Sequence, residues 1–291
     1  MSSINEGLPT DMPTIRERYT AHDHMTEPGT FGSLYDHLPS DVSALRKLVS
    51  QLIVHVSLAD KYEIPATMAR PRETQSASDR LRLIQATLNE PLDVPRPPHQ
   101  RTFGTCRDYS LLLCSMLRHQ AIPARIRCGF ANYFSAAPYQ DHWICEYWSE
   151  REQRWYRVDA QLDEMQAHEL GIAFNPSDLP NDVYLTAGQA WILVRNGGAL
   201  ADEFGHGDDR GLWFLNVNLH RDLLALTNQQ TSIWDTWRTA TPGTKLVDMS
   251  GKAFGDEIAA EIVRADSTSD ALSQLFELAA LAMPPPWIAS R

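Results

Sequence analysis

The sequence predicts a fold of the α+β class, in which helices and antiparallel strands occupy separate stretches of the chain. An apolar helix is expected after Gly104, because leucine and methionine recur through residues 111–117. Three strand-like runs follow between residues 124 and 158, and a charged turn joins the last two as in a hairpin. Helical spacing of apolar residues returns before and after this block. We therefore expect a helix packed on an antiparallel sheet, with additional N- and C-terminal helices.

The predicted central helix begins at a cysteine. Thr105 followed by Asp108 resembles a capping box, so Thr105 is expected to be the N-cap and Cys106 the first helical residue. Backbone N–H groups and the positive end of the helix dipole gather there, which lowers the pKa of a thiol and supplies donors for an oxyanion. Gly104 allows the sharp turn into the helix. Cys106 is thus a candidate nucleophile, and the alternative is a structural cysteine in the core.

A histidine and an aspartate lie at the ends of the predicted hairpin strands. If residues 149–152 form the turn, Trp148 faces Gln153, and counting back places His142 opposite Asp159. Directly opposed residues have Cβ atoms about 4.5–5.5 Å apart, close enough for a carboxylate to hold an imidazole. A shift of two residues would keep the same face but break this pairing. Taken singly, the two are a half-buried strand histidine and a strand-end cap; with the candidate nucleophile they suit cysteine catalysis.

Four short segments carry these candidate residues: Gly104-Thr105-Cys106-Arg107-Asp108, Ile122-Pro123-Ala124-Arg125, Asp141-His142-Trp143 and Arg157-Val158-Asp159-Ala160. In order and spacing they resemble bacterial-type members of the transglutaminase-like superfamily, over about a fifth of the chain. The resemblance implies a papain-like α+β core and acyl transfer through a thiol. It further implies Cys106 as nucleophile, His142 as base and Asp159 as the residue that orients the base. Two neighbours depart from the family pattern: Thr105 replaces a large aromatic residue, and Ala160-Gln161 replaces the commoner Pro-Thr.

Composition limits the classes of partner and compartment. The chain has 291 residues, 43% of them hydrophobic, which is enough for a sizeable core. Its net charge of −11 argues against nucleic acid or an anionic membrane surface as a partner. No apolar run approaches the roughly 18–20 residues of a membrane span. Residues 1–25 lack an apolar signal region, so a soluble, cytoplasmic protein is expected.

Neither a metal nor another cofactor is indicated. The cysteines show no CxxC pair, so zinc is not expected, and a chain of this size needs no disulfide framework. His22 and His24 have no nearby residue to complete a site and are assigned to a solvated loop. No loop rich in Asp or Asn has the spacing of a calcium site. Cys114 follows two turns after the candidate nucleophile and is interpreted as core. The four cysteines are Cys106, Cys114, Cys128 and Cys145.

The rest of the chain is expected to form a single domain over residues 40–291, after an irregular segment 1–39. Its core is predicted at about 77–163, followed by a helical extension over 164–291. A helix over 41–59 would contain His55, which is interpreted as a packing or surface residue. Prolines at 91–98 force an extended approach to the central helix. Further helices are expected at 77–89, 163–170, 182–195, 214–226 and 256–282 (split near 267–268), with a surface loop at 204–211 and a tryptophan cluster at 233–237 on the core.

The leading functional hypothesis is a cysteine-dependent enzyme that hydrolyses an amide through a thioester at Cys106. The amide could belong to a peptide, an isopeptide or a small molecule. The first alternative is amide-bond formation, by aminolysis of an acyl donor or a carrier thioester. The second alternative is a non-catalytic binding module on the same fold. The sequence fixes neither the substrate nor the oligomeric state, because specificity lies in loops and flanking helices.

Overall fold

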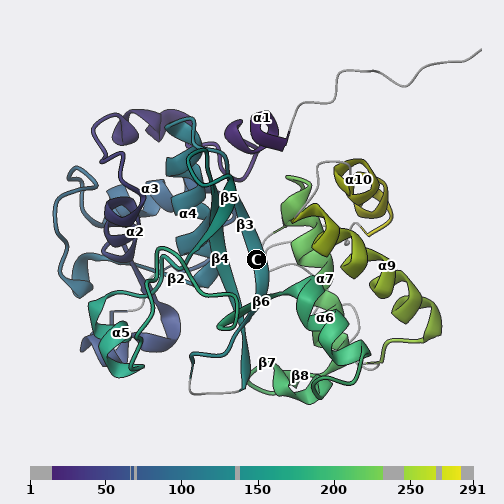
Figure 1. The fold of residues 1–291 in the computed structure, drawn as a ribbon. Helices are drawn as coiled ribbons and strands as arrows, with labels where there is room; N and C mark the ends of the chain where they lie inside the picture. The colour runs from purple at the N-terminus through teal and green to yellow at the C-terminus, as the bar shows by residue number, and fades with distance from the viewer. Residues whose placement is uncertain are drawn as a thin grey trace, which may run out of the picture.

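The computed structural model describes residues 15–65, 67–68, 71–134, 138–231, 246–266 and 271–282, and its architecture is α+β (Figure 1). The tryptophan cluster predicted at 233–237 lies outside the described residues. The helices are α1 (Ile15–Thr20), α2 (Val42–Ser50), α3 (Ala77–Thr87), α4 (Cys106–His119), α5 (Glu164–Glu169), α6 (Ala187–Arg195), α7 (Leu212–Leu226), α9 (Met249–Ala265) and α10 (Ala271–Ala282). The strands are β1 (Ile53–His55), β2 (Thr102–Gly104), β3 (Ala124–Ala131), β4 (Tyr139–Ser149), β5 (Arg154–Val158), β6 (Tyr184–Thr186), β7 (Phe204–His206) and β8 (Asp209–Arg210).

The main sheet has the strand order β6-β3-β4-β7-β8, and β5 also pairs with β4. β3 and β4 are antiparallel from Ala124 opposite Tyr147 to Ala131 opposite Gln140. On the other edge of β4, β5 pairs with residues 145–149 and β7 pairs with residues 139–140. Residues 141–144 of β4 therefore lie between these two ladders. That part of the β4 edge pairs with neither β5 nor β7.

Helices cover both sides of the sheet (Figure 1). On one side, α2, α3 and α4 share a hydrophobic core with β3 and β4. On the other side, α6, α7, α9 and α10 form a second core, into which Phe130 of β3 and Phe204 of β7 project. The two phenylalanine rings meet edge to face, with centroids 5.2 Å apart. Apolar burial on both faces of the sheet is thus the main source of stability.

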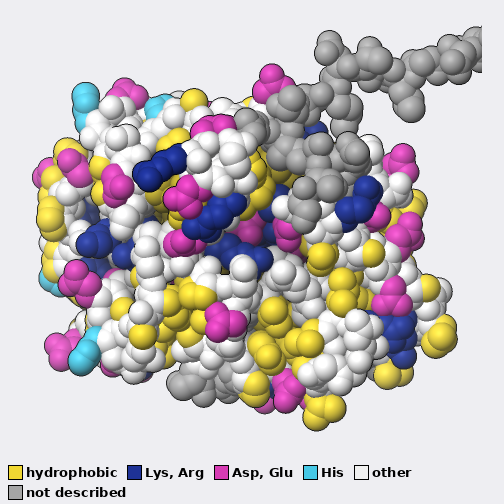
Figure 2. Space-filling view, viewed as in Figure 1, with side chains coloured by type: hydrophobic (Ala, Val, Ile, Leu, Met, Phe, Trp, Pro, Cys, Tyr) yellow, Lys and Arg dark blue, Asp and Glu magenta, His cyan; other side chains and the backbone are white. Residues whose placement is uncertain are grey.

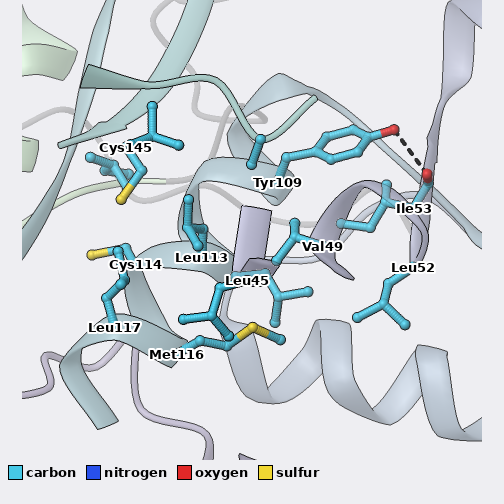
Figure 3. Close-up of a cluster of buried hydrophobic side chains, with 14 of the residues drawn as sticks. Leu45, Val49, Leu52, Ile53, Tyr109, Leu113, Cys114, Met116, Leu117 and Cys145 are labelled. Atoms are coloured by element: carbon cyan, nitrogen blue, oxygen red, sulfur yellow. Dashed lines mark hydrogen bonds between the residues drawn. The ribbon is translucent and has the colours of Figure 1, made fainter. Parts of the chain in front are cut away.

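Helix α4 lies in the first core along almost its whole length. Tyr109 of α4 donates a hydrogen bond from its hydroxyl to the carbonyl of Ile53 in β1 at 3.0 Å (Figure 3). These contacts fix the direction of the helix and therefore the position of its first residue, Cys106. The apolar residues of α4 and α2 in this core include Leu112, Leu113, Met116, Leu117, Leu45 and Val49, all 0% exposed.

The structure corrects the prediction of a helix over residues 41–59. α2 ends at Ser50, and Ile53–His55 form strand β1 instead. β1 runs parallel to β2, with His55 paired to Gly104. A short apolar run fits a strand or a helical turn equally well by spacing. Residues 53–55 form a strand because they pair with β2, which is distant in sequence. The pairing satisfies backbone hydrogen-bonding groups of both segments.

Three other segments also differ from the sequence-based expectations. Residues 182–195 begin with β6 before α6, and 204–211 form the β7–β8 hairpin rather than a loop. Both changes add short strands to the sheet, since β6 pairs with β3 and β7 with β4. The segment 1–39 contains α1 and a 3-10 helix at Gly29–Tyr35.

The helices predicted at 77–89, 163–170 and 214–226 are confirmed as α3, α5 and α7. α9 and α10 confirm the pair predicted over 256–282, although α9 begins earlier and the predicted division lies outside the described residues.

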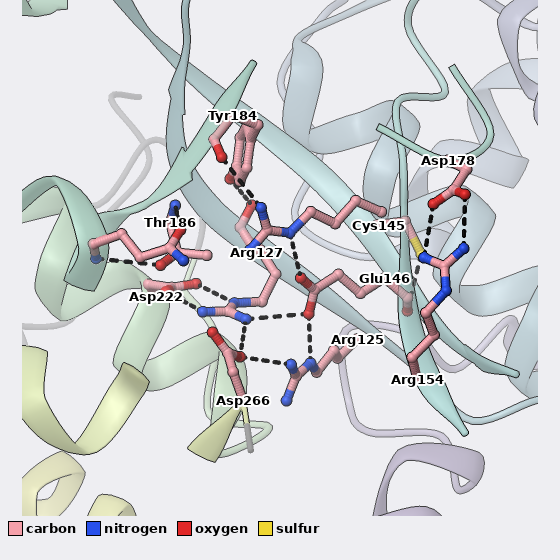
Figure 4. A network of polar contacts seen from close by, with 12 residues as sticks. Arg125, Arg127, Cys145, Glu146, Arg154, Asp178, Tyr184, Thr186, Asp222 and Asp266 are labelled. Atoms are coloured by element: carbon pink, nitrogen blue, oxygen red, sulfur yellow. Dashed lines mark hydrogen bonds and ion pairs between the residues drawn. The ribbon is translucent and has the colours of Figure 1, made fainter. Parts of the chain in front are cut away.

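A buried ion network joins the sheet to the C-terminal helices (Figure 4). Arg127 of β3 pairs with Asp222 of α7 at 2.9 Å and with Asp266, after α9, at 2.7 Å. Arg125 pairs with the same Asp266 at 2.8 Å, and both arginines pair with Glu146 of β4. Removing one partner would leave a buried charge without its counter-charge. The network therefore holds the sheet and the C-terminal helices in one arrangement.

Charge is mixed on the face shown in Figure 2, where basic and acidic side chains lie next to one another between the two helical groups. In the ranges that the structure describes, no helix combines the length and apolar character needed to cross a bilayer.

Candidate active site

Cys106 is the first residue of α4 and lies within the predicted capping box of Thr105 and Asp108. Thr105 is the N-cap, with extended backbone angles of φ −119° and ψ 172°. Its N–H donates to Asp108 Oδ2 at 2.7 Å, and its hydroxyl lies 3.1 Å from the same oxygen. The first N–H groups of a helix have no carbonyl one turn earlier to bind. Backbone donors and the positive end of the helix therefore gather beside the thiol.

Asp108 is held in turn by residues from outside the helix. Its Oδ1 pairs with Arg80 Nη2 of α3 at 2.8 Å and accepts a hydrogen bond from Thr74 Oγ1 at 2.7 Å. Burial raises the pKa of Asp108, but the charge of Arg80 and the hydrogen bonds from Thr74 and Thr105 outweigh burial and lower it. The carboxylate thus stays ionised and anchors the first helical turn, and with it the direction of Cys106.

His142 and Asp159 meet, although by a different register from the predicted one. His142 Nε2 lies 2.9 Å from Asp159 Oδ2, and both side chains are buried. β5 ends with Val158 paired to Cys145, so one further step of the ladder would place Asp159 opposite Ile144. The hairpin is therefore shifted by two residues, and the expected direct opposition was wrong. The two side chains share a face and meet diagonally, across the roughly 7–8 Å that separates such positions.

The turn explains this shift. Ser149 pairs with Arg154, so the four residues between them form the turn, and Trp148 faces Trp155 instead of Gln153. Gln153 has a φ of 51°, a left-handed conformation that suits a turn and not a strand. Its N–H donates to the Ser149 carbonyl at 2.8 Å. The turn is therefore residues 150–153 and not 149–152: Ser149 belongs to β4 and Gln153 to the turn, which together shift the register by two residues.

Asp159 accepts hydrogen bonds on both carboxylate oxygens. Besides His142, the hydroxyl of Tyr133 donates to Oδ2 at 2.7 Å and the N–H of Gln161 donates to Oδ1 at 2.8 Å. Burial raises the pKa of Asp159, but the charge of His142 and these hydrogen bonds outweigh burial and lower it. Asp159 is therefore a fixed anion at one end of the imidazole.

His142 is favoured in its charged form. Burial lowers the pKa of His142, but the carboxylate of Asp159 and side-chain hydrogen bonds to Asp159 and Cys106 raise it to about 10. Because Nε2 faces Asp159, Nδ1 is the ring nitrogen left for the thiol. A neighbouring cation stabilises a thiolate over a thiol. The arrangement can thus supply both a nucleophile and a proton donor.

Aromatic rings from the segment after β3 surround this imidazole. Phe134 and Tyr133 meet His142 edge to face, with ring centroids 4.9 Å and 5.9 Å away. Phe174 packs on Tyr133 at 5.3 Å. This apolar wall limits the water around the His142–Asp159 pair, which strengthens their electrostatic interaction.

Two other aspartates near the predicted site have separate partners. Asp141 Oδ1 accepts a hydrogen bond from Asn218 Nδ2 of α7 at 2.7 Å. Asp163 is the N-cap of α5 and accepts a hydrogen bond from the Tyr62 hydroxyl at 2.6 Å. Both carboxylates are therefore engaged away from the His142 ring.

The other cysteines differ from Cys106 in accessibility. Cys114, Cys128 and Cys145 are 0% exposed, whereas Cys106 is 7% exposed, and all four are free thiols. Burial raises the pKa of Cys128 and Cys145 well above the ordinary value. The core position predicted for Cys114 is confirmed, and Figure 3 shows it near Cys145.

Among the described residues, no group of three or more His, Cys, Asp or Glu side chains is placed to hold a metal ion.

Two histidines near this site were not connected with it by the sequence. His55 ends β1, and its partner Gly104 lies two positions before Cys106. His206 ends β7, and its Nδ1 lies 3.1 Å from Gln140 Nε2 of β4, two positions before the candidate base. The sequence placed these histidines in a helix and a loop, because strands of three residues carry no reliable periodic signal.

A thiol at a helix start, an imidazole on a strand and a carboxylate after the next strand define a papain-like arrangement of the cysteine enzymes. Residues 78–160 match the family model described as Transglutaminase-like superfamily. That segment runs from α3 through Asp159, so the chain contains the transglutaminase-like core that its motifs predicted.

Among solved structures, the chain is similar to a proposed cysteine protease from Cytophaga hutchinsonii. The two are 18% identical, with a TM-score of 0.35, and the match covers 54% of this chain and 45% of that one. The match therefore spans less than half of that protein. A likeness this distant carries no information about substrate. The comparison with curated proteins found no significant match.

Proposed function

We propose that this protein hydrolyses an amide through an acyl-thioester at Cys106. The observation that carries the proposal is the 2.9 Å contact between His142 Nε2 and Asp159 Oδ2, beside a thiol that begins a helix. The transglutaminase-like family match supports a cysteine-dependent enzyme in general. Amide hydrolysis is the finer assignment that we add.

The first half-reaction forms the thioester. In the resting site the proton of Cys106 is already on His142, and the thiolate attacks the carbonyl carbon of the amide. As the S–C bond forms, the π pair of the carbonyl moves to oxygen, where helix N–H groups stabilise it. When the carbonyl re-forms, the C–N bond breaks and the leaving nitrogen takes the proton from His142. Asp159 holds the ring throughout.

The second half-reaction releases the acyl group. His142, now neutral, takes a proton from water as the water oxygen attacks the thioester carbonyl. The C–S bond then breaks, the carboxylic acid departs, and Cys106 returns as the thiolate beside the protonated ring. The charged state favoured for His142 is thus the state in which each turnover ends.

Amide formation is the second candidate, and the apolar wall beside His142 favours it. Tyr133 and Phe134 cover the ring with aromatic surface, which restricts water at the acyl group. An amine bound at the same place would then attack the thioester in place of water. Hydrolysis and amide formation share the step that forms the thioester. They differ only in whether water or an amine then accepts the acyl group.

The test uses p-nitrophenyl acetate, a small acyl donor that needs no specific pocket. Intact-protein mass spectrometry with peptide mapping should find one acetyl group on Cys106 of the parent, and Cys106→Ala should release no nitrophenolate burst. Partition of the acetyl group between water and added glycine amide would separate hydrolysis from amide formation. A parent protein that gains no acetyl group at Cys106 would refute the enzyme and favour the binding module.

A further inference from the structure

His55 lies beside the residues that lead into α4, because β1 pairs with β2. His55 pairs with Gly104, and Ile53, two residues earlier, shares its face of the strand. A Cβ added at Gly104 would lie 2.9 Å from Ile53 Cγ2 and 3.0 Å from Asp108 Oδ2. This face of the β1–β2 pair therefore abuts the first turn of α4, which Cys106 begins.

The tautomer of His55 is set by its own chain. The N–H of Ser57 donates to His55 Nδ1 at 3.3 Å, and the Ser57 hydroxyl lies 2.7 Å from the same nitrogen. A ring nitrogen that accepts a backbone N–H cannot carry a proton itself. The proton of the neutral ring is therefore on Nε2, which leaves Nε2–H as a donor.

The ring is also uncharged in the range where a thiol enzyme works. Burial, followed by the charges of His142 and His206, lowers the pKa of His55 to about 4, while Asp108 and Asp159 act in the opposite direction with less effect. A neutral ring does not compete with the His142 cation for the thiolate. It can donate a hydrogen bond without losing its proton.

We propose that His55 is a catalytic residue that donates from Nε2–H to the oxyanion, as the second donor beside the backbone N–H of Cys106. The proposal rests on the acyl-transfer function above. When the thiolate forms the S–C bond and the carbonyl π pair moves to oxygen, that oxygen gains the negative charge which the two donors share. When the pair returns and the leaving group departs, both donors remain protonated.

Two reactions of the same thiol separate this role from others. Acylation of Cys106 by p-nitrophenyl acetate passes through an oxyanion, whereas alkylation by iodoacetamide displaces iodide and forms none. His55→Phe should slow acylation by about 10²–10³-fold, the usual cost of losing one oxyanion donor. Alkylation of Cys106 in the same variant should keep the parent rate. His55→Gln, whose amide N–H can replace the ring donor, should recover most of the acylation rate.

Three outcomes would overturn the role of His55. The first is acylation of His55→Phe at the parent rate, and the second is equal loss of acylation in His55→Phe and His55→Gln. The third is a parallel loss of alkylation, which would place the effect on the thiolate or the fold. Failure of the proposed function is a different result, since the parent itself would then not acylate at Cys106.

Discussion

His142 and Asp159 are joined diagonally across the β4–β5 hairpin, with 2.9 Å between Nε2 and Oδ2, although the ladder pairs neither residue with the other. The contact is possible because β5 ends at Val158 and β7 pairs with β4 only further along the same edge. The strand edge around His142 is therefore left open between two ladders. The thiol at the start of α4 acts on the same ring, since the interaction with Cys106 contributes to the raised pKa of His142.

Cys106 should be the most reactive of the four cysteines. It is the only one of them with any exposed surface, at 7% against 0% for the others, and it lies beside a charged imidazole. We expect limiting iodoacetamide at about pH 6–7 to alkylate Cys106 first, as activated thiols do. Peptide mapping of the native protein measures this. Equal labelling of all four cysteines would rule out Cys106 as the nucleophile.

Stability should distinguish a catalytic cysteine from a core residue. Cys106→Ala removes little volume at a helix start, so the free energy of unfolding should change by at most about 1 kcal/mol. Leu113→Ala, at a 0% exposed position of the same helix, should cost about 2–5 kcal/mol because it leaves a cavity. Urea denaturation of both variants provides the comparison. If Cys106→Ala loses as much stability as Leu113→Ala, Cys106 is a packing residue.

Asp159→Asn should impair the thiol without changing the fold. The amide keeps the shape of the carboxylate but removes the charge that raises the pKa of His142, and it favours the wrong ring tautomer. We expect slower alkylation of Cys106 at neutral pH than in the parent. The measurement is the pH dependence of labelling.

Asp141→Asn and Asp163→Asn are the matched controls for that experiment. Asp141 is bonded to Asn218, and Asp163 caps α5, so both variants should label like the parent. Slower labelling of Cys106 at neutral pH in Asp141→Asn, with Asp159→Asn unchanged, would contradict the assignment of Asp159.

Tyr133→Phe should weaken the site through Asp159. The change removes only the hydroxyl that donates to Asp159 Oδ2 at 2.7 Å and keeps the ring beside His142. A hydrogen bond to a charged group contributes about 1.5–3 kcal/mol, so the unfolding free energy should fall by that order. Alkylation of Cys106 should also slow. Tyr147→Phe, whose ring stacks on Tyr156 away from the carboxylate, should change neither quantity.

The raised pKa of His142 predicts how stability depends on pH. The pKa is about 6.5 in an unfolded chain and about 10 in the folded protein, so the folded state binds the proton more tightly. The stability from this proton is fully present below about pH 6.5 and is lost as the pH rises through about 10. Unfolding free energies of the parent and His142→Gln should therefore converge toward alkaline pH. A constant difference between about pH 6 and 10 would contradict the charged ring.

The sequence by itself determined the local features of the site. Thr105 and Asp108 specify the start of α4, since a capping box requires only residues three positions apart. The apolar spacing through residues 111–117 specifies the helix, and the alternation around the charged turn specifies the hairpin. These signals depend on neighbours in the chain and are therefore visible in it.

Only the tertiary structure decided the register, the short strands and the neighbours of the site. Ser149 joined β4 and Gln153 joined the turn, so the β4–β5 register moved by two residues, which local spacing could not distinguish. His55 came to lie beside Gly104, two residues before Cys106, because β1 pairs with β2, a segment far away in sequence. Such a pairing depends on the burial and hydrogen bonding of both strands together. Neither segment contains that information alone, so it appears only when the chain has folded.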